Sequence, residues 1–285
     1  MKNNLALKII IPLIAVLAAF AAGMGLFYQT KGTSYPFTSL RGESVMINGH
    51  GLYYYDTVSS AAQQQGNDIV TLFVALPMLV ITTWLTLRDS LRGRLLLTGT
   101  IGFFLYTYLS MCMLTAFNAL FLVYVALFGL SLYAFILCML SFDLAALPRH
   151  FSECLPRGWI AGLLFLISGF LAVAWLGKVL NPILQNVPPV LDNTTTFVIQ
   201  AMDLALIIPL AILSAVLLLR RSALGYLLTS VFIMKAITLG LAVSAMVVNM
   251  NLAGTPENSS IAVPFLVITV LNLAAAVSLL KNIKA

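Results

Sequence analysis

Charged residues are scarce in this chain of 285 residues: Asp, Glu, Lys and Arg together make up 8%, while apolar residues make up 61%. Soluble domains typically contain about 25% charged residues. A chain with so little charge cannot cover itself with a solvated surface, which excludes a soluble globular protein. The mean hydropathy of +1.03 is typical of an integral membrane protein.

Histidine and cysteine are also rare, with two and three residues. His50 and His150 are predicted on opposite sides of the membrane, which excludes a bis-histidine haem site within one chain. The cysteines lack a CxxC spacing and none falls in a predicted external loop, so we expect free thiols. His150, Glu153 and Cys154 share one short loop without a zinc spacing. We therefore expect no metal site and no cofactor.

Motifs of several enzyme classes are missing. The patterns GxxxxGK[ST], HExxH and GxSxG are absent, which disfavours the enzymes that depend on them. The net charge of +6 comes from basic residues spread in small groups, with no nucleic-acid-binding motif around them. A non-enzyme is therefore favoured over an enzyme, and no nucleic-acid partner is expected.

Eight long apolar stretches organise the chain. A helix needs roughly 20 apolar residues at about 1.5 Å rise each to cross the hydrocarbon core. The predicted spans cover residues 8–27, 69–87, 95–116, 119–141, 159–177, 198–219, 224–248 and 263–280. The first is expected to be a retained span rather than a cleaved secretion signal. Because these runs are apolar on all faces, they predict an all-α polytopic bundle rather than a β-barrel.

The basic residues predict the orientation. With the N-terminus in the cytoplasm, eleven Lys and Arg lie in the inner segments, three lie in the outer ones, and Lys235 lies within a span. The positive-inside rule therefore favours both termini in the cytoplasm and a multi-pass location in the bacterial inner membrane. The lipid bilayer is the partner that composition implies, and association into oligomers stays open.

The longest polar segment, residues 28–67, is predicted as an external loop. Residues 45–47 and 50–55 flank Asn48 and Gly49. An Asn-Gly pair suits the positive φ angles of a type I′ turn, so the pattern predicts a small β-hairpin here.

The end of this loop holds further candidate residues. Asp56 is placed to cap a short helix over residues 57–65, which Gly66 would end. Capping is favoured over ligand binding for Asp56, and interfacial packing over ligand contact for Tyr54. Asp56, Tyr54 and Asp68 are the loop's binding candidates.

Two neighbouring spans each carry one charge, Asp203 and Lys235. A lone charge in the hydrocarbon core costs about 2.5–3.5 kcal/mol on the insertion scale, so Lys235 needs a partner or a hydrated cavity. Their depths differ by only a few ångströms, within reach of a lysine side chain. Gln200 and Thr238 share their helix faces, and Asn272 lies near the midplane of the last span. These five residues are the predicted ligand- or ion-binding cluster in the outer half.

The charge pair has several interpretations. A structural ion pair that locks two helices is the simplest. Alternatively, Lys235 passes a proton or balances a bound anion. A Schiff-base lysine that holds a chromophore is less favoured, because that lysine lies in the last of seven helices in a rhodopsin, whereas an eighth span follows here.

A parallel internal repeat is a further hypothesis. Shifting the sequence by 132 residues superposes identical residues: Pro77 on Pro209, Arg88 on Arg220, Ser90 on Ser222, Gly93 on Gly225, Leu95 on Leu227 and Leu96 on Leu228. Spans one to four and five to eight would then be related by an axis along the membrane normal. Many transporters have such repeats, with the binding site between the halves.

The segments 53–77, 91–108 and 203–246, which include Lys235, resemble those of a group of bacterial polytopic membrane proteins. The resemblance covers most of the chain. It implies a bacterial membrane origin and no particular activity.

Transport or binding of a small solute or ion through the outer-half cluster is the leading functional hypothesis. Ile207 and Leu210 continue the Asp203 face inward as an apolar seal, which favours a gated carrier over an open pore. The first alternative is a sensor or assembly partner that acts through the loop 28–67. The second is an intramembrane enzyme, which would need a lipid-accessible cavity around Asp203.

Overall fold

The computed structural model describes residues 5–255 and 262–284. Within these residues, eight helical segments are long and apolar enough to cross a membrane. They are α1 (Leu5–Phe27); α2 (Val58–Val70) continued by the π-helical η1 (Thr71–Ala75) and by α3 (Leu76–Leu87); α4 (Leu91–Leu114); α5 (Phe121–Leu140); α6 (Arg157–Gln185); α7 (Val198–Met202) continued by the π-helical η3 (Asp203–Ile207) and by α8 (Ile208–Leu219); α9 (Ala223–Leu252); and α10 (Ala262–Lys281). The prediction of an all-α, multi-pass membrane protein is confirmed.

Helices α4 and α9 form the interior of the bundle. They contact each other, α4 also contacts α3 and α5, and α9 also contacts α2, α8 and α10. These two helices are the most buried of the spans. Helix α4 has the lowest mean hydropathy of the eight, and its Thr98, Thr100 and Thr107 side chains are buried. Such small polar residues suit contact with other helices rather than with lipid.

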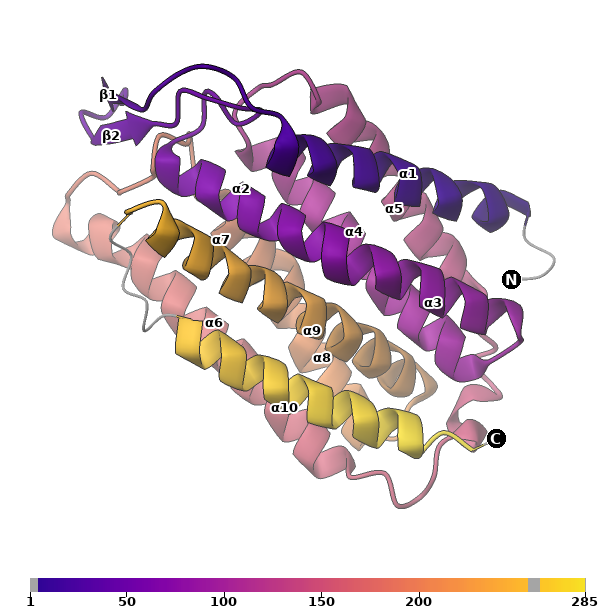
Figure 1. Cartoon of the computed structure of the whole chain (residues 1–285). Helices are drawn as coiled ribbons and strands as arrows, with labels where there is room; N and C mark the ends of the chain where they lie inside the picture. The colour runs from indigo at the N-terminus through magenta and orange to yellow at the C-terminus, as the bar shows by residue number, and fades with distance from the viewer. Residues whose placement is uncertain (1–4, 256–261, 285) are drawn as a thin grey trace.

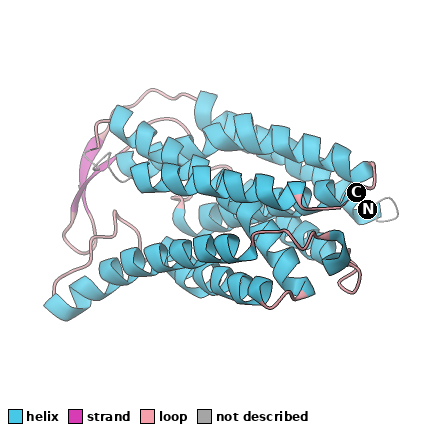
Figure 2. Ribbon diagram, turned by 90° about the horizontal axis from the view of Figure 1, so that it is seen from below, coloured by secondary structure: helices cyan, strands magenta, loops and turns pink. Residues whose placement is uncertain are grey.

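The two ends of the bundle differ. Figures 1 and 2 show both ends of the chain at one end of the bundle and the two β-strands at the other. We call these the terminal end and the hairpin end.

At the hairpin end, β1 (Tyr35–Thr38) pairs antiparallel with β2 (Ser44–Ile47). The turn between the strands reaches the loop that follows α6, because Arg41 donates hydrogen bonds to the carbonyls of Thr194 and Thr195 at 3.3 and 3.0 Å. The two long loops of this end are thereby joined.

The predicted hairpin around Asn48 and Gly49 was wrong. Residues 50–55 form turns rather than a strand. Gly49 has a φ of 72°, but Asn48 is not in the positive-φ region, which a type I′ turn requires at both positions. The Asn48 side-chain amide instead donates to the carbonyl oxygens of His50 and Tyr53.

The short helix predicted after Asp56 is also not a separate element, since α2 continues without a break into the second span. Thr57, not Asp56, is the N-cap. Gly66 does not end the helix: it lies where α2 crosses α9, and a Cβ atom there would be 2.6 Å from Met246 Cα. Asp68, predicted in the external loop, therefore lies inside α2 and is buried.

Two spans contain a π-helical turn just before a proline. Pro77 and Pro209 are the second residues of α3 and α8, directly after η1 and η3. Proline has no N–H to donate to the carbonyl four residues back. In both spans the preceding residue donates five residues back, to Thr71 O in one and to Asp203 O in the other. Such π turns are frequent at functional sites, and η3 begins at Asp203.

A short bridge ties the terminal end together. Phe151 pairs with Ile283 as an isolated antiparallel bridge, and Arg92 Nη2 donates to Ile283 O at 2.6 Å. The loop between α5 and α6, which contains the 3-10 turn η2 (Leu147–His150), is thereby joined to the C-terminal segment and to the start of α4.

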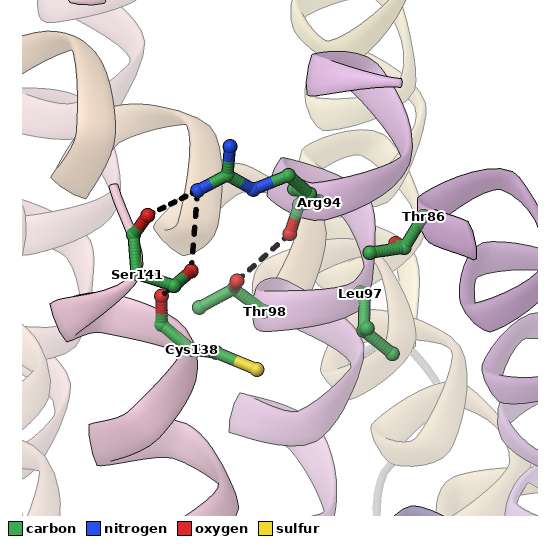
Figure 3. Close-up of a pocket in the computed structure, with 6 residues that line it drawn as sticks. All are labelled: Thr86, Arg94, Leu97, Thr98, Cys138 and Ser141. Atoms are coloured by element: carbon green, nitrogen blue, oxygen red, sulfur yellow. Dashed lines mark hydrogen bonds between the residues drawn. The ribbon is translucent and has the colours of Figure 1, made fainter. Parts of the chain in front are cut away.

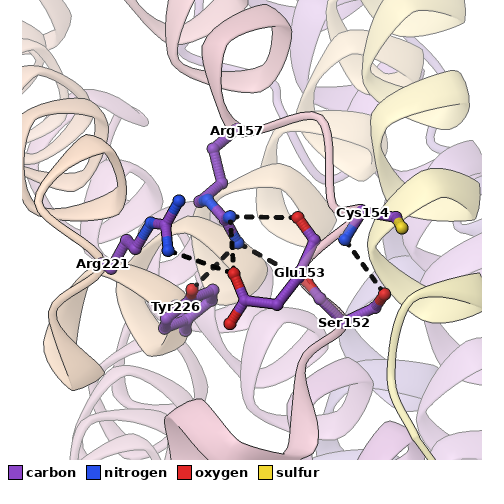
Figure 4. Close-up of polar contacts among 6 residues, drawn as sticks. All are labelled: Ser152, Glu153, Cys154, Arg157, Arg221 and Tyr226. Carbon is purple, nitrogen blue, oxygen red and sulfur yellow. Dashed lines mark hydrogen bonds and ion pairs between the residues drawn. The ribbon is translucent and has the colours of Figure 1, made fainter.

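A polar group beside this bridge connects the same loop to α9 (Figure 4). Glu153 pairs with Arg157 at 3.4 Å and with Arg221 at 3.1 Å. Arg157 also donates to Tyr226 Oη at 3.2 Å, and the Tyr226 ring stacks on Phe151 with centroids 4.6 Å apart. Because the Glu153 side chain is largely exposed, the stacking and packing stabilise this end more than the ion pairs do.

Candidate functional site

Asp203 lies at the first position of η3 and is 5% exposed. Each of its carboxylate oxygens accepts a hydrogen bond. Tyr106 Oη donates to Oδ1 at 2.7 Å, and Trp175 Nε1 donates to Oδ2 at 2.8 Å. Tyr106 belongs to α4 and Trp175 to α6, so the carboxylate joins three spans through two neutral donors. Such donors stabilise a buried carboxylate without neutralising its charge.

Lys235 lies in α9 and is 7% exposed. Its Nζ is 3.8 Å from the centroid of the Tyr106 ring, which is a cation–π contact. Within the described residues, no atom accepts a hydrogen bond from this Nζ, and no direct ion pair joins it to Asp203. An ammonium group has three N–H donors, so Lys235 retains its donor capacity inside the protein.

Tyr106 therefore connects the two charges: its hydroxyl binds Asp203 and its ring face holds the ammonium of Lys235. We call Asp203, Tyr106, Trp175 and Lys235 the Tyr106 cluster. A Cβ atom added at Gly102 would lie 3.8 Å from Lys235 Cγ, so the lysine stem runs along this glycine.

Sequence reasoning predicted Asp203 and Lys235 as neighbours but missed the other two members of the cluster. Tyr106 and Trp175 carry no charge and lie in no recognised motif, so nothing in the sequence links them to the pair. The depth of each residue can be estimated from the sequence. Which helices surround η3 cannot, because adjacency depends on side-chain packing across the bundle.

The other three residues of the predicted cluster do not bond to its charged groups in the described structure. Gln200 is buried one turn before Asp203. Thr238 Oγ1 donates to the backbone carbonyl of Lys235 at 2.9 Å. Asn272 Nδ2 donates to Ile268 O at 2.9 Å, which keeps its amide nitrogen within α10.

A second buried carboxylate belongs to the first half of the chain. Tyr53 Oη donates to Asp68 Oδ2 at 2.6 Å, and Asp68 is 2% exposed. Gly25 of α1 packs directly against this carboxylate, leaving no room for a Cβ atom. Asp68 is therefore a buried acid between α1 and α2 rather than a ligand on an external loop.

Asp56 and Tyr54 remain at the hairpin end, in the loop. Asp56 Oδ1 accepts hydrogen bonds from Ser60 Oγ at 2.8 Å and from Ala116 N at 3.1 Å, which ties the start of α2 to the loop after α4. Burial raises the pKa of Asp56 from 3.8 to about 6, although these bonds lower it. Tyr54 packs edge to face against Tyr55, with ring centroids 4.9 Å apart.

The described cavities are small and lie away from the Tyr106 cluster. One is lined by Thr86, Arg94, Leu97, Thr98, Cys138 and Ser141 (Figure 3). In it, Arg94 donates to the Ser141 carbonyl and packs on the Phe142 ring at 4.7 Å. This cavity and a second one between α4, α9 and α10 have volumes of about 10 Å³, room for about one water molecule each. Neither of these two cavities is lined by Asp203, Tyr106, Trp175 or Lys235.

Within residues 5–255 and 262–284, no group of three or more His, Cys, Asp or Glu side chains could hold a metal ion. Cys112, Cys138 and Cys154 are free thiols.

Comparison of the chain with models of protein families, with curated protein sequences and with solved structures gave no match.

Proposed function

We propose that this membrane protein binds or transports a small solute or ion, with the Tyr106 cluster as its site. The observation that carries the proposal is the ammonium group of Lys235, buried in a membrane-spanning helix with unused N–H donors. A lysine that only stabilises a bundle is normally paired with a carboxylate or with carbonyl oxygens. Here Asp203 binds neutral donors, and the aromatic ring of Tyr106 stands beside the ammonium. The ammonium of Lys235 is therefore able to take another partner.

We assign the hairpin end to the outside and both termini to the cytoplasm of a bacterial inner membrane. The excess of Lys and Arg in the inner segments, eleven against three, supports this orientation. Asp203 then lies five residues, or roughly 8 Å, below the outer start of α7. The Tyr106 cluster would accordingly open toward the outside first.

We further propose that spans one to four and spans five to eight form a parallel repeat. The segments η1 and η3 are 132 residues apart, and the turns that follow α3 and α8 contain Asp89 and Arg221 with φ of 60° and 54°. Gly93 packs against Leu85 in the last turn of α3, and Gly225 packs against Leu217 in the last turn of α8. The helix contacts also correspond, because α4 packs on α5 as α9 packs on α10. The Tyr106 cluster then combines a residue of the first half with three of the second, as in transporters whose site lies between repeats.

A carrier fits these observations better than an open pore. Below Asp203 the same helix presents Ile207, which is 8% exposed, and then Leu210. These apolar side chains interrupt any polar path toward the terminal end. A solute would therefore cross only after the helices rearrange.

Reconstituted protein tests the proposal. The purified chain in liposomes is presented with a panel of inorganic ions, amines, carboxylic acids and neutral solutes while solid-supported membrane electrophysiology and tracer uptake are recorded. We expect uptake or current for at least one solute, and a loss of tenfold or more, equivalent to about 1.4 kcal/mol, in Lys235→Met and Asp203→Asn.

Lys281→Met is the matched control, because Lys281 is exposed at the end of α10. Thermal unfolding in detergent identifies which variants are folded. Unchanged transport in folded Lys235→Met and Asp203→Asn would show that the site is elsewhere.

Sensing or assembly through the external loop is the second candidate function. The hairpin favours it because Tyr35, Phe37 and Leu40 are exposed apolar side chains, with Leu40 fully exposed. Replacing these three with serine would abolish partner binding under this alternative and leave transport intact under the leading one. The intramembrane enzyme is disfavoured, since both oxygens of Asp203 already accept hydrogen bonds.

A further inference from the structure

The Tyr106 cluster already holds one alkylammonium group, and this indicates a ligand class. Lys235 Nζ lies over the Tyr106 ring, whose hydroxyl binds Asp203. An aromatic face beside a carboxylate is the combination that recognises organic ammonium ligands. We propose that an external alkylammonium ligand replaces the Lys235 ammonium in this cluster, and that Lys235 releases its proton as the ligand enters. This inference rests on the proposed function and names its substrate class.

The number of charges in the cluster supports exchange rather than addition. Asp203 is the one carboxylate that faces Lys235, and Tyr106 is the one other titratable group beside it in the described structure. Of the other helices packed on α9, α8 has no titratable side chain, α10 has only Lys281 at its far end, η2 has Arg149 and His150 at the terminal end, and Asp68 of α2 binds Tyr53. One carboxylate balances one cation. A second ammonium would repel the first strongly where water is scarce.

The exchange balances in atoms and in charge. Lys235 passes from –NH₃⁺ to –NH₂ and its proton goes to water, while the ligand brings one positive charge to Asp203. The cluster has one negative and one positive charge before and after binding. When the exchange occurs on one side of the membrane and is reversed on the other, one organic cation crosses in one direction for each proton that crosses in the opposite direction.

Three neighbouring residues bear on the replacement. Gly102 has no side chain, so the Lys235 stem packs directly along the α4 backbone, with Cγ 3.8 Å from the position a Cβ atom would take. Trp175 and Tyr106 keep Asp203 oriented as neutral donors, so the carboxylate keeps its position when the cation changes. An anion is the poorer candidate, because it would have to bind close to the Asp203 carboxylate.

Binding and proton release, measured together, test the inference. Tetramethylammonium chloride and methylammonium chloride are the probes, with sodium chloride as the inorganic control. Calorimetry of the purified full chain in detergent gives the binding, and a pH indicator in weak buffer gives the protons released. We expect about one proton released per ammonium bound to the wild-type chain.

The variants separate the roles of the two charges. Lys235→Met should bind the ammonium probes with little proton release, and Asp203→Asn should bind them at least tenfold more weakly. Lys235→Arg should also bind weakly, because a guanidinium does not lose its proton. Lys281→Met should behave as the wild type. The arginine variant keeps the test decisive if Lys235→Met does not fold.

Two results would overturn the exchange and leave the proposed function standing. The first is binding of ammonium probes to the wild type without proton release. The second is release of as many protons from Lys235→Met as from the wild type. Tighter binding of sodium than of either ammonium probe would overturn the ligand class. Absence of binding, together with absence of transport for the whole solute panel, would refute the proposed function, and the exchange with it.

Discussion

Tyr106 is the residue that gives the site its character. Its hydroxyl donates to Asp203 while its ring face contacts Lys235, so two opposite charges share one neutral neighbour without forming an ion pair. A direct ion pair in this environment would be strong and hard to open. Held apart from Asp203 by the ring, the ammonium of Lys235 is able to take another partner.

Removing the Tyr106 hydroxyl tests its role toward Asp203. In Tyr106→Phe the ring remains for Lys235, but a buried carboxylate oxygen loses its donor. We expect a loss of stability of about 1–3 kcal/mol, measured by denaturant unfolding in detergent. Tyr133→Phe is the control, since Tyr133 is 63% exposed on α5. Equal stability of Tyr106→Phe and the wild type would contradict the assigned hydrogen bond.

Asp56 predicts a pH dependence at the hairpin end. Its pKa is raised by burial from 3.8 to about 6, so the folded state binds the proton more tightly than the unfolded state. Stability is then greatest below about pH 4 and falls as the pH rises toward 6, by roughly 3 kcal/mol if the whole shift is expressed. Asp56→Asn mimics the protonated form and should remove this fall.

Hydrogen exchange of the Ala116 amide, which donates to Asp56, is the measurement for that residue. After correction for the intrinsic exchange rate at each pH, the Ala116 amide of the wild type should exchange faster at pH 7 than at pH 5. The same amide in Asp56→Asn should exchange at similar corrected rates at both pH values. A wild-type loop that becomes more stable as the pH rises would have the wrong sign.

Individual helices depend on glycine for close contacts with their neighbours and on proline for their π turns. The π turn η3 places Asp203 at its first residue, before Pro209. Elsewhere in the bundle, Gly66 lets α2 cross α9 with the two backbones in contact. Both features occur inside spans where hydropathy alone predicts an uninterrupted apolar helix.

Gly66→Ala should destabilise the protein. The added Cβ atom would lie 2.6 Å from the Cα and N atoms of Met246, so α2 and α9 must separate. Overpacking of this kind costs about 1–3 kcal/mol, which thermal unfolding in detergent should reveal. Gly169→Ala on α6 is the control, because nothing lies within 4 Å of its Cβ position. A stabilised Gly66→Ala variant would mean that the crossing is looser than described.

The spans were predictable from sequence because burial in lipid requires about 20 apolar residues regardless of neighbours. The proximity of Asp203 and Lys235 was predictable from depth. The strand pairing was not, because β2 pairs with β1, upstream in the chain, and the segment after Gly49 returns to β2 only through an isolated bridge between Ile47 and Thr57. Tyr106 and Trp175 were missed for a similar reason: their roles depend on contacts between distant spans.

The terminal end of the molecule is closed by contacts that join the two halves of the chain. The loop between α5 and α6 pairs with the C-terminal segment, and Arg92 of α4 binds that segment. For a carrier, these contacts must loosen when the bundle opens toward this end. They are therefore the place to look for a rearrangement linked to ligand binding.

Arg92→Ala should loosen this closure. Without the hydrogen bond to Ile283 O, we expect exchange of the Lys284 amide, which donates to His150 O at 2.7 Å, to become about tenfold faster. Arg88→Ala is the control, since Arg88 stacks on Trp84 in the same turn and leaves the bridge intact. Unchanged exchange in Arg92→Ala would mean that the bridge holds without it.

The most direct test of the central claim is whether water and ligand reach position 235. In a chain with Cys112, Cys138 and Cys154 replaced by alanine, the Lys235→Cys thiol is treated in the membrane with 2-aminoethyl methanethiosulfonate. Our account predicts modification from the hairpin end, slowed at least several-fold by tetramethylammonium at the cluster. A thiol that stays unmodified in the membrane but is fully modified in the denatured chain would contradict it. Position 235 would then be sealed from water, and Lys235 would have only a structural role.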